Sequence, residues 1–385
     1  MKICILTPRF PFPENGGDVL RINNIARYLK GQGHKLLLVS FCDNSNVDME
    51  EANDLYGKVF LVKRKKVMSF AYSLLFMLRG LPIQCGYYHS PIFRKLFHEV
   101  VVNECPDRYI SHLLRMAPYL EKEHLCALST VEMTDALSKT YSLSSRAKGL
   151  SFKKIIYKIE LKLIKKYEEK VIKIFPKVVV VSHSDLDFLK QSIEHTKSLV
   201  LHTNGVDCLS DYTGTYKSNK ISFIGNMRTL QNQDAVLHFV KKIFPVILKH
   251  NPKAVFYIVG AQPSHEIMSL DNKKNIIVTG FVEDLVGMIS DSCLAVAPVN
   301  IAAGIQNKVL MAMGCGIPVV MTSLISKAIP ELKNGENCFI CDDDNDFANI
   351  CIQIMENSVM RDKIGRNGFD MVKSNYSWKD KLNGY

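Results

Sequence analysis

The chain has 385 residues, of which 47% are hydrophobic and 23% are charged. This length exceeds what one hydrophobic core usually organises, so two domains of ordinary size are expected. The balance of apolar and charged residues is typical of soluble globular proteins and excludes both a disordered chain and a membrane-embedded body. The net charge of +11 would suit a nucleic acid or an anionic membrane, so its placement matters more than its total.

The N-terminal residues and the cysteines both point to the cytoplasm. The opening MKICILTPRF contains an apolar run of only four residues, which is too short for a signal peptide. Cys4, Cys42, Cys126 and Cys293 lie in apolar, strand-like runs and are expected to be reduced core residues. The pair 338/341 has the spacing of a metal or redox site, but a second pair is missing, so no metal site is predicted.

Short β-branched runs alternate with helical patterns along the whole chain, which is typical of parallel sheets flanked by helices. In the first half, the predicted strands are 2–7, 34–41, 58–62, 107–111, 127–133, 177–182 and 198–203. In the second half, they are 220–225, 254–260, 275–280, 293–298, 317–321 and 337–341. Residues 204–220 are rich in turn formers and are predicted to link two doubly wound, Rossmann-like α/β domains that face a central cleft.

Two segments combine positive charge with apolar residues. Residues 148–177 contain ten Lys and three Glu above an apolar stripe at helical spacing, formed by Phe152, Ile155, Ile156, Ile159, Leu163, Tyr167, Val171 and Ile174. The basic run 63–66 precedes twelve mainly apolar residues, 67–78, against the roughly 20 needed to span a bilayer. The shorter segment is predicted to lie on a membrane surface. For the longer segment, membrane contact and a solvated helix face over a domain core are equal alternatives. Binding of nucleic acid is not expected, because the helix lacks interleaved aromatic residues suited to base stacking.

The loop after the first predicted strand ends in Gly16 and Gly17, directly before a helix that begins near Asp18. Glycines let a phosphate approach the backbone amides, and a helix N-terminus favours an anion. The loop lacks the G-x-G-x-x-G pattern of dinucleotide sites. It therefore predicts either a phosphate contact or a plain turn.

A second informative loop follows strand 293–298. Gly304 precedes a helix whose first turn holds Gln306, Asn307 and Lys308, so backbone donors, an amide side chain and an ammonium group come together. This arrangement suits a diphosphate leaving group. The alternative is an ordinary surface lysine.

The order and spacing of these segments resemble the GT-B glycosyltransferases of the large family 4 type (glycosyl transferases group 1), and more narrowly their GIQNKV-containing branch. The resemblance runs over nearly the whole chain, through PFPENGG, VVVVSHSD, HTNGVD, FIGNMRTLQNQDAVLHF, VTGFVEDL and GIQNKVLMAMGCGIPVV. It implies an acceptor-binding domain over 1–205, a nucleotide-sugar-binding domain over 206–372, and a segment 373–385 that returns toward the first domain.

The resemblance also implies an activity, a pathway and partners. The expected reaction is metal-independent transfer of a hexosyl or related sugar, with retention, from a nucleotide sugar to a lipid-linked or saccharide acceptor. The expected process is bacterial cell-surface polysaccharide assembly, of O-antigen or capsule, at the anionic inner face of the plasma membrane. The nucleotide sugar is a donor substrate, and no other cofactor is expected.

Carried over by position, the resemblance makes Gly17 and Lys308 contacts to the donor diphosphate. Asn226 occupies the place where the family has a basic residue, so Arg228 is the candidate to supply that positive charge to the donor instead. The donor base would meet backbone groups of Gly280, Phe281 and Val282.

In the first domain, Asp135, which follows Thr134, and His112 are the catalytic candidates. A structural aspartate and a core histidine are the respective alternatives. No carboxylate pair at glycosidase-like spacing is identifiable, so no protein nucleophile is named.

One departure from the family concerns the donor site. Two family glutamates, eight positions apart, correspond here to Ala303 and Met311, and a thioether cannot accept the strong hydrogen bonds that a carboxylate offers to a ribose diol. Met311 thus leaves three possibilities open: another group holds the ribose, donor affinity is reduced, or catalysis is lost. The rival functions are a catalytically silent GT-B partner in polysaccharide assembly and a sugar-nucleotide epimerase of GT-B architecture.

Overall fold

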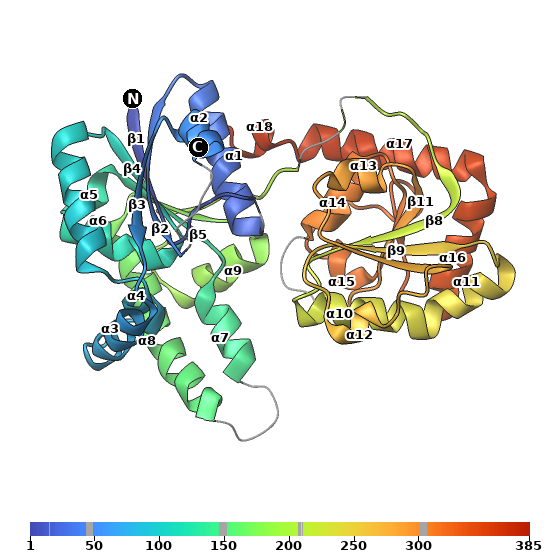
Figure 1. Ribbon diagram of the computed structural model, residues 1–385, viewed down its shortest axis with the longest axis horizontal. Helices are drawn as coiled ribbons and strands as arrows, with labels where there is room; N and C mark the ends of the chain where they lie inside the picture. Colours follow the sequence, from blue (N-terminus) through green and yellow to red (C-terminus); the bar gives the residue numbers. More distant parts are fainter. Residues whose placement is uncertain (15, 44–48, 146–151, 207–208, 210, 301–305) are drawn as a thin grey trace. The chain divides into compact units, whose positions relative to one another are not determined.

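The computed structural model describes residues 1–14, 16–43, 49–145, 152–206, 209, 211–300 and 306–385. The chain divides into two units, one formed by residues 1–203 with 384–385 and the other by residues 204–383. Each unit is a parallel β-sheet flanked by helices (Figure 1). The α/β class and all the predicted strands are therefore confirmed, with strand ends shifted by a few residues.

The first unit contains a seven-stranded parallel sheet in the order β3-β2-β1-β4-β5-β6-β7. Its strands are β1 (Lys2–Thr7), β2 (Lys35–Cys42), β3 (Lys58–Lys63), β4 (Arg108–His112), β5 (Ser129–Thr134), β6 (Lys177–Val180) and β7 (Leu199–Leu201). Central strands such as β2 are near-continuous apolar runs because helices cover both faces of the sheet. The strand order reverses between β1 and β4, and ligands in such sheets bind beyond the carboxyl ends at that point.

The helices of the first unit connect these strands. They are α1 (Gly17–Gly31), α2 (Glu50–Tyr56), α3 (Lys66–Leu78), α4 (Ile83–Tyr87), α5 (Pro91–Glu104), α6 (Ala117–Lys122), α7 (Leu137–Ser145), α8 (Phe152–Ile174) and α9 (His183–Ser192). In Figure 1, α1 and α2 lie on one face of the sheet and α5 and α6 on the other, while α3 and α4 lie beyond its carboxyl-end edge. Local signals define their starts: Ser90 accepts a hydrogen bond from the Phe93 amide at 3.3 Å and Pro91 occupies the first position of α5.

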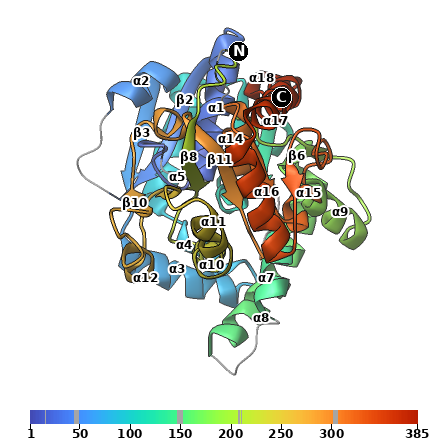
Figure 2. The same ribbon diagram turned by 90° about the vertical axis from the view of Figure 1, so that its right-hand side faces the viewer.

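The second unit contains a six-stranded parallel sheet in the order β10-β9-β8-β11-β12-β13, which reverses between β8 and β11. Its strands are β8 (Lys217–Ile224), β9 (Val255–Val259), β10 (Ile276–Gly280), β11 (Ser292–Ala297), β12 (Val319–Met321) and β13 (Phe339–Ile340). Its helices are α10 (Leu230–His238), α11 (Phe244–His250), α12 (His265–Met268), α13 (Leu285–Ile289), α14 (Asn307–Gly314), α15 (Ser323–Ser326), α16 (Asp344–Glu356), α17 (Ser358–Asn375) and α18 (Trp378–Lys381). Figures 1 and 2 show α14 and α17 on one side of β8 and β11, and α10 and α11 on the other.

The boundary between the two units differs from the predicted linker. Residues that were predicted to connect the domains pack within the second unit, where the Val206 amide donates to the Tyr376 carbonyl at 2.8 Å and the Tyr212 hydroxyl donates to Asp362 at 2.7 Å. The last two residues belong to the first unit, where Lys177 Nζ donates to the Gly384 carbonyl at 3.1 Å.

The basic helix α8 buries only part of the predicted apolar stripe. Tyr167 and Val171 reach the core as predicted, together with Ile164, whereas Ile174 is exposed although it was expected on the apolar face. Toward the start of α8, three isoleucines are exposed: Ile155, Ile156 and Ile159. The apolar stripe thus exceeds what the core covers. Cys126 also differs from expectation, because it lies in a 3₁₀ turn and is only partly buried.

A buried ion pair joins α1 to the centre of the first sheet. Arg21 and Glu132 are 1% and 0% exposed, and the guanidinium donates to the carboxylate through Nε at 2.6 Å and Nη2 at 3.0 Å. The hydroxyl of Tyr385 is buried beside this pair, and burial together with the charge of Glu132 raises the pKa of that hydroxyl well above its usual value. This bidentate geometry repays the desolvation of both charges only while both partners are present.

We expect Arg21→Met to lower the free energy of unfolding by about 3–5 kcal/mol, because it leaves the Glu132 carboxylate buried and unpaired. Urea denaturation followed by far-UV circular dichroism measures the loss. The double variant Arg21→Met/Glu132→Leu should recover much of it. Arg27→Met removes an exposed pair with Glu14 and should cost less than about 1 kcal/mol. A single-variant loss as small as that of Arg27→Met would contradict the prediction.

Candidate functional site

Three neighbouring strands of the second sheet end in glycines that approach one another closely. The Gly225 amide donates to the Val259 carbonyl at 3.0 Å, and the Gly260 amide donates to the Gly280 carbonyl at 3.2 Å. Gly260 has a φ of +147°, and a Cβ at this position would lie 1.9 Å from the Gly225 carbonyl oxygen. Only glycine fits there. The sheet edge at the carboxyl ends of β8, β9 and β10 is therefore formed by closely approaching backbone rather than by side chains, and we call it the glycine edge.

Lys308 lies at the start of α14, beside the end of β8. Its Nζ donates to Asn232 Oδ1 at 2.6 Å and lies 4.6 Å from the centre of the Phe223 ring. Burial lowers the pKa of Lys308 from 10.5 to about 8. Within the described ranges the ammonium group has no carboxylate partner, so its neighbours are a neutral amide and an aromatic face.

Asn232 connects this lysine to the glycine edge. Its side-chain amide donates to the Asn226 carbonyl at 2.9 Å, and a Cβ on Gly225 would come within 2.6 Å of the same group. Asn232 is 6% exposed and was not among the predicted site residues. The sequence signal was available: glycine is the last residue of each of three consecutive predicted strands, and a polar residue follows seven positions beyond Gly225.

The other residues predicted for the donor site lie around this edge. Gln306 is buried and precedes the first turn of α14, and Asn307 has a buried Oδ1 with no hydrogen-bond partner among the described residues. Arg228 is exposed, and its backbone amide donates to Asn226 Oδ1 at 2.9 Å. Gly304 and Ala303 lie outside the described residues.

The base-binding and ribose-binding candidates differ in exposure. Gly280 has a φ of +69° and open space where a Cβ would be, and Phe281 after it is 58% exposed. Val282 and Met311 are partly buried and pack against the second core. Met311, the position predicted to lie beside the ribose, therefore takes a packing position.

In the first unit, the loop after β1 contains Gly16, which lies close to an ion pair between Arg9 and Asp18. Arg9 Nε donates to Asp18 Oδ2 at 3.0 Å, and a Cβ on Gly16 would lie 2.9 Å from the Arg9 guanidinium. Burial alone would raise the pKa of Asp18, but the charge and hydrogen bond of Arg9 hold it below its usual value. Gly17, the first residue of α1, is exposed with open space around its Cα.

A pocket of about 320 Å³ lies where the start of α1 meets the ends of β4 and β5, and we call it the strand-end pocket. It is lined by Asp18, Leu113, Leu114, Arg115, Met133, Thr134, Asp135 and Leu137. Leu113 and Thr134 have φ values of +68° and +63°, which residues with a Cβ rarely adopt. Strain of this kind persists where the surrounding structure imposes it and clusters at functional sites. The pocket also coincides with the strand reversal of the first sheet.

His112 is the last residue of β4 and is 2% exposed. Neither ring nitrogen has a hydrogen-bond partner among the described residues. Burial is the main cause that lowers the pKa of His112 to about 4, against the opposing charges of Asp18 and Glu132. A neutral imidazole with two unsatisfied nitrogens can donate one hydrogen bond and accept another.

Asp135 lines the strand-end pocket and remains accessible to solvent. Its pKa is raised, first because the surrounding protein displaces water from the carboxyl group and then because Asp185 repels its negative charge. The structure thus brings Asp135 together with Asp18 and Arg115, neither of which sequence reasoning placed in a catalytic role. Arg115 could have been found from its position three residues after the end of a strand.

Neither a metal site nor a membrane-spanning helix is present among the described residues. In those ranges no group of three His, Cys, Asp or Glu side chains could hold a metal ion. The described helices also include none that is long and apolar enough to cross a membrane.

Comparison with known proteins matches residues 218–357 to the model of the family described as glycosyl transferases group 1. A curated protein from Klebsiella pneumoniae, described as an uncharacterized 44.6 kDa protein in the cps region, is 23% identical over 98% of this chain and 97% of its own length. HepE from Anabaena, solved in complex with UDP-glucose, has a TM-score of 0.69 at 12% identity and covers 100% of this chain and 98% of its own.

WaaG, a glycosyltransferase involved in lipopolysaccharide biosynthesis, has a TM-score of 0.65 at 13% identity, with 98% of each chain covered. These identities establish the fold and not the substrate. The chain is a two-domain α/β protein with the GT-B fold, and residues 218–357 of its second unit match the glycosyl transferases group 1 model.

Proposed function

We propose that this chain is a glycosyltransferase whose second unit holds the diphosphate of a nucleotide-sugar donor at Lys308. The observation that carries the proposal is the ammonium group itself, which is largely removed from water and has only the Asn232 amide and the Phe223 ring as described neighbours. A desolvated cation without a counter-charge is unfavourable in the free protein. An incoming diphosphate would supply a counter-charge to this ammonium group.

The position of Lys308 supports the same reading. It follows β11, next to β8, where the strand order of the sheet reverses and ligands of such folds bind. A Cβ on Gly280 would meet no atom within 4 Å, which leaves space for a ligand at the glycine edge, and the start of α14 adds its own amides. Arg228, exposed on the turn before α10, can reach an anion without first breaking an ion pair within the described chain.

The first unit would position the acceptor and the reacting sugar at the strand-end pocket. Asp135, with its raised pKa, is proposed to orient or deprotonate an acceptor hydroxyl, and the neutral His112 to bind a sugar hydroxyl. Gly17 would offer its amide to the donor phosphate. We propose hexosyl transfer with retention and without a metal or further cofactor, in which stabilising the departing nucleoside diphosphate is the main catalytic task.

The biological process is proposed from the descriptions of similar proteins. HepE was solved with UDP-glucose, WaaG is involved in lipopolysaccharide biosynthesis, and the Klebsiella protein is in a cps region. We therefore propose a role in cell-surface polysaccharide assembly, of capsule or O-antigen, on the cytoplasmic face of the plasma membrane. Membership of the GIQNKV-containing branch is part of the same proposal.

One observation favours a second function. Met311 packs against the core and offers no acceptor to a ribose diol. A catalytically silent partner in polysaccharide assembly would tolerate this substitution, and it is distinguished from the transferase by nucleotide binding.

We expect calorimetric titration with UDP-glucose, UDP and GDP to show saturable binding that Lys308→Ala weakens by about 10–100-fold, the range for losing a hydrogen bond to a charged group. Lys249→Ala, on the exposed end of α11, removes the same charge elsewhere in the unit and should leave the dissociation constant unchanged. If no nucleotide binds at millimolar concentration, the silent-partner function replaces the transferase.

The pKa of Lys308 predicts a pH dependence of donor binding. In the free protein the ammonium group loses its proton above about pH 8, whereas a bound diphosphate favours the charged form and raises this pKa. The dissociation constant for UDP should therefore rise by up to about tenfold per pH unit above pH 8. Lys308→Arg keeps its charge and should flatten the profile, so equal slopes for both proteins between pH 8 and 9.5 would exclude Lys308 as the diphosphate ligand.

A further inference from the structure

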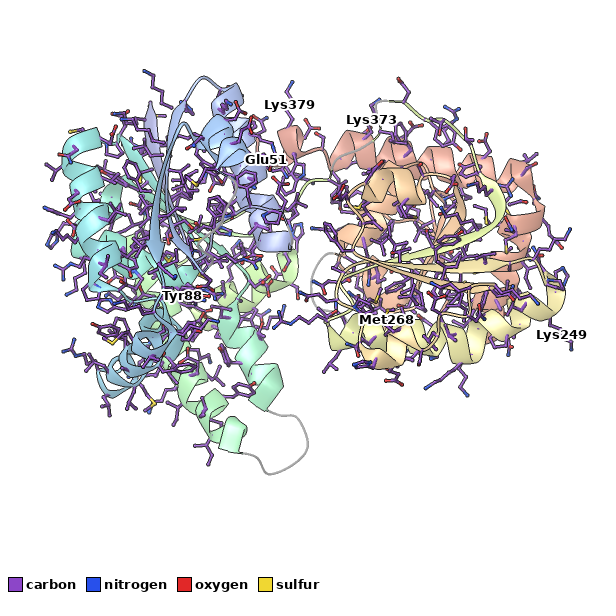
Figure 3. All side chains as sticks on the ribbon, in the orientation of Figure 1. Glu51, Tyr88, Lys249, Met268, Lys373 and Lys379 are labelled. Atoms are coloured by element: carbon purple, nitrogen blue, oxygen red, sulfur yellow. The ribbon has the colours of Figure 1, made fainter. Side chains whose placement is uncertain are left out.

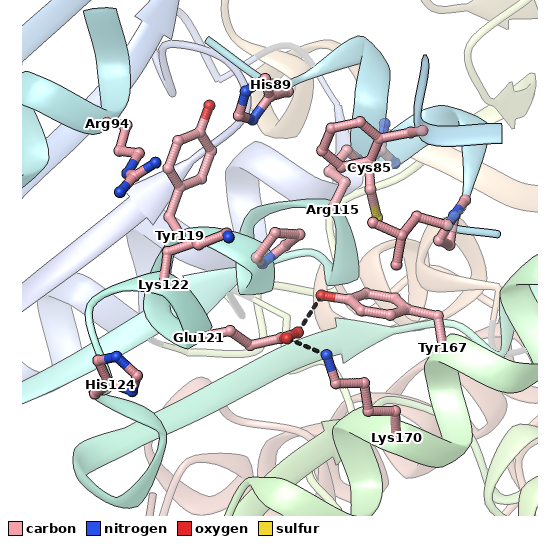
Figure 4. Close-up of a pocket in the computed structure, with 14 residues that line it drawn as sticks. Cys85, His89, Arg94, Arg115, Tyr119, Glu121, Lys122, His124, Tyr167 and Lys170 are labelled. Carbon is pink, nitrogen blue, oxygen red and sulfur yellow. Dashed lines mark hydrogen bonds and ion pairs between the residues drawn. The ribbon is translucent and has the colours of Figure 1, made fainter. Parts of the chain in front are cut away.

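The first unit contains a second cavity, of about 550 Å³, which we call the helical pocket. It lies among α3, α4, α6 and α8, and its walls carry two kinds of side chain (Figure 4). Phe76, Leu81 and Pro82 form an apolar side. The other side carries Arg94, Arg115, Lys122 and Lys170, against Glu121 as the one carboxylate in the lining.

The carboxylate does not neutralise this set of cations. Glu121 accepts a hydrogen bond from the Tyr167 hydroxyl at 2.6 Å and is ion-paired with Lys170 (Figure 4). Arg94, Arg115 and Lys122 make no ion pair with any residue that the structure describes. The pocket therefore has an excess of positive charge, and an anion is the ligand that would balance it.

Arg115 is held ready for such a ligand. Its guanidinium lies over the Tyr88 ring, 5.1 Å from the centroid, and Arg64 lies 5.0 Å from the same centroid. Tyr88 lies where α4 meets the sheet (Figure 3). The Nε of Arg115 is buried and has no hydrogen-bond partner among the described residues. A buried donor of this kind is costly unless a ligand satisfies it.

The electrostatics at His89 agree with this picture. Burial lowers the pKa of His89, and the charges of Arg94 and Lys122 lower it further. His89, Arg94 and Lys122 all line the helical pocket, so the charges that lower this pKa lie within the pocket itself. The field in the helical pocket is thus positive around a neutral imidazole.

An exposed apolar surface adjoins the pocket. Phe76 faces the pocket from α3, while Val67, Phe70, Leu74 and Leu78 of the same helix are 82%, 67%, 56% and 74% exposed. Figures 1 and 2 show α3 and the start of α8, with its exposed isoleucines, at the same end of the first unit. Exposed apolar side chains on a helix that is preceded by a basic run are typical of contact with lipid.

Helices α3 and α4 pack closely against each other beside the pocket. A Cβ on Gly86 would lie 2.5 Å from the Tyr72 carbonyl oxygen, so the two helices touch through backbone. Glu160 of α8 accepts hydrogen bonds from the amides of Ile83 and Gln84 at 2.7 and 3.2 Å and ties the start of α4 to α8.

We propose that the helical pocket binds the phosphate or diphosphate head of an amphiphilic lipid whose hydrocarbon chain lies along α3. Resting on the proposed function, this identifies the acceptor as a lipid-linked phosphate rather than a free saccharide. Arg115 lines both the helical pocket and the strand-end pocket. A lipid phosphate at Arg115 would therefore place the group attached to it beside Asp18 and Asp135.

The test is binding of dodecyl phosphate, below its micellar concentration, to the intact protein by isothermal titration calorimetry. The double variant Arg94→Gln/Lys122→Gln should weaken binding by about 10–100-fold. Lys165→Gln/Lys166→Gln removes two exposed charges of α8 outside the pocket lining and should change binding less than about twofold, because screened surface charges act weakly at a distance. Equal affinities for the two double variants would overturn the proposal.

Two further arms identify the source of the anion. Inorganic phosphate should bind far more weakly than dodecyl phosphate, and Phe70→Ser/Leu74→Ser should remove most of that difference, because the alkyl chain loses its apolar surface. Inorganic phosphate that binds as tightly as dodecyl phosphate would show a site for free anions and overturn the lipid. UDP binding, measured separately, should be the same in all these variants, so a failure of the donor site and a failure of the lipid site are distinguishable.

Discussion

The buried ion pair between Arg21 and Glu132 is the interaction on which the first unit depends. It joins α1 to β5, and the strand-end pocket is built from the start of the one and the end of the other. Asp18 lies one turn before Arg21, and Asp135 follows Glu132 by three residues. A pair this deeply buried adds little stability compared with an apolar contact, but losing one partner is very costly, so it makes the relative position of the two elements specific.

Unbalanced positive charge is the feature that both units share. Lys308 in the second unit, and Arg94, Arg115 and Lys122 in the first, have no carboxylate partner in the described parts of the chain. Such groups cost free energy in the empty protein and become favourable when a phosphate arrives. A donor diphosphate and a lipid phosphate, as proposed above, would balance the two sets.

The backbone at the carboxyl ends of the strands differs between the two sheets. In the second unit, Gly225 and Gly260 let backbone meet backbone, and the absence of side chains leaves room for a ligand. In the first unit, Leu113 and Thr134 adopt positive φ values in spite of their Cβ atoms. The local pattern of glycines could be read along the chain, whereas the strain could not, because it is imposed by strands that pair across long stretches of sequence.

The sequence by itself determined the α/β class, the strands of both sheets and the two loops that carry Gly17 and Lys308, because apolar periodicity and glycine placement are local properties. Only the tertiary structure decided that Arg21 and Glu132 form a pair, that Asn232 holds Lys308, and that Arg115 lines two pockets.

The tertiary structure also decided which stripe of α8 is buried, since a helix that is apolar on more than one side can pack in several ways. These contacts join residues far apart in the chain. Their partners are chosen by packing and desolvation, which no short sequence window contains.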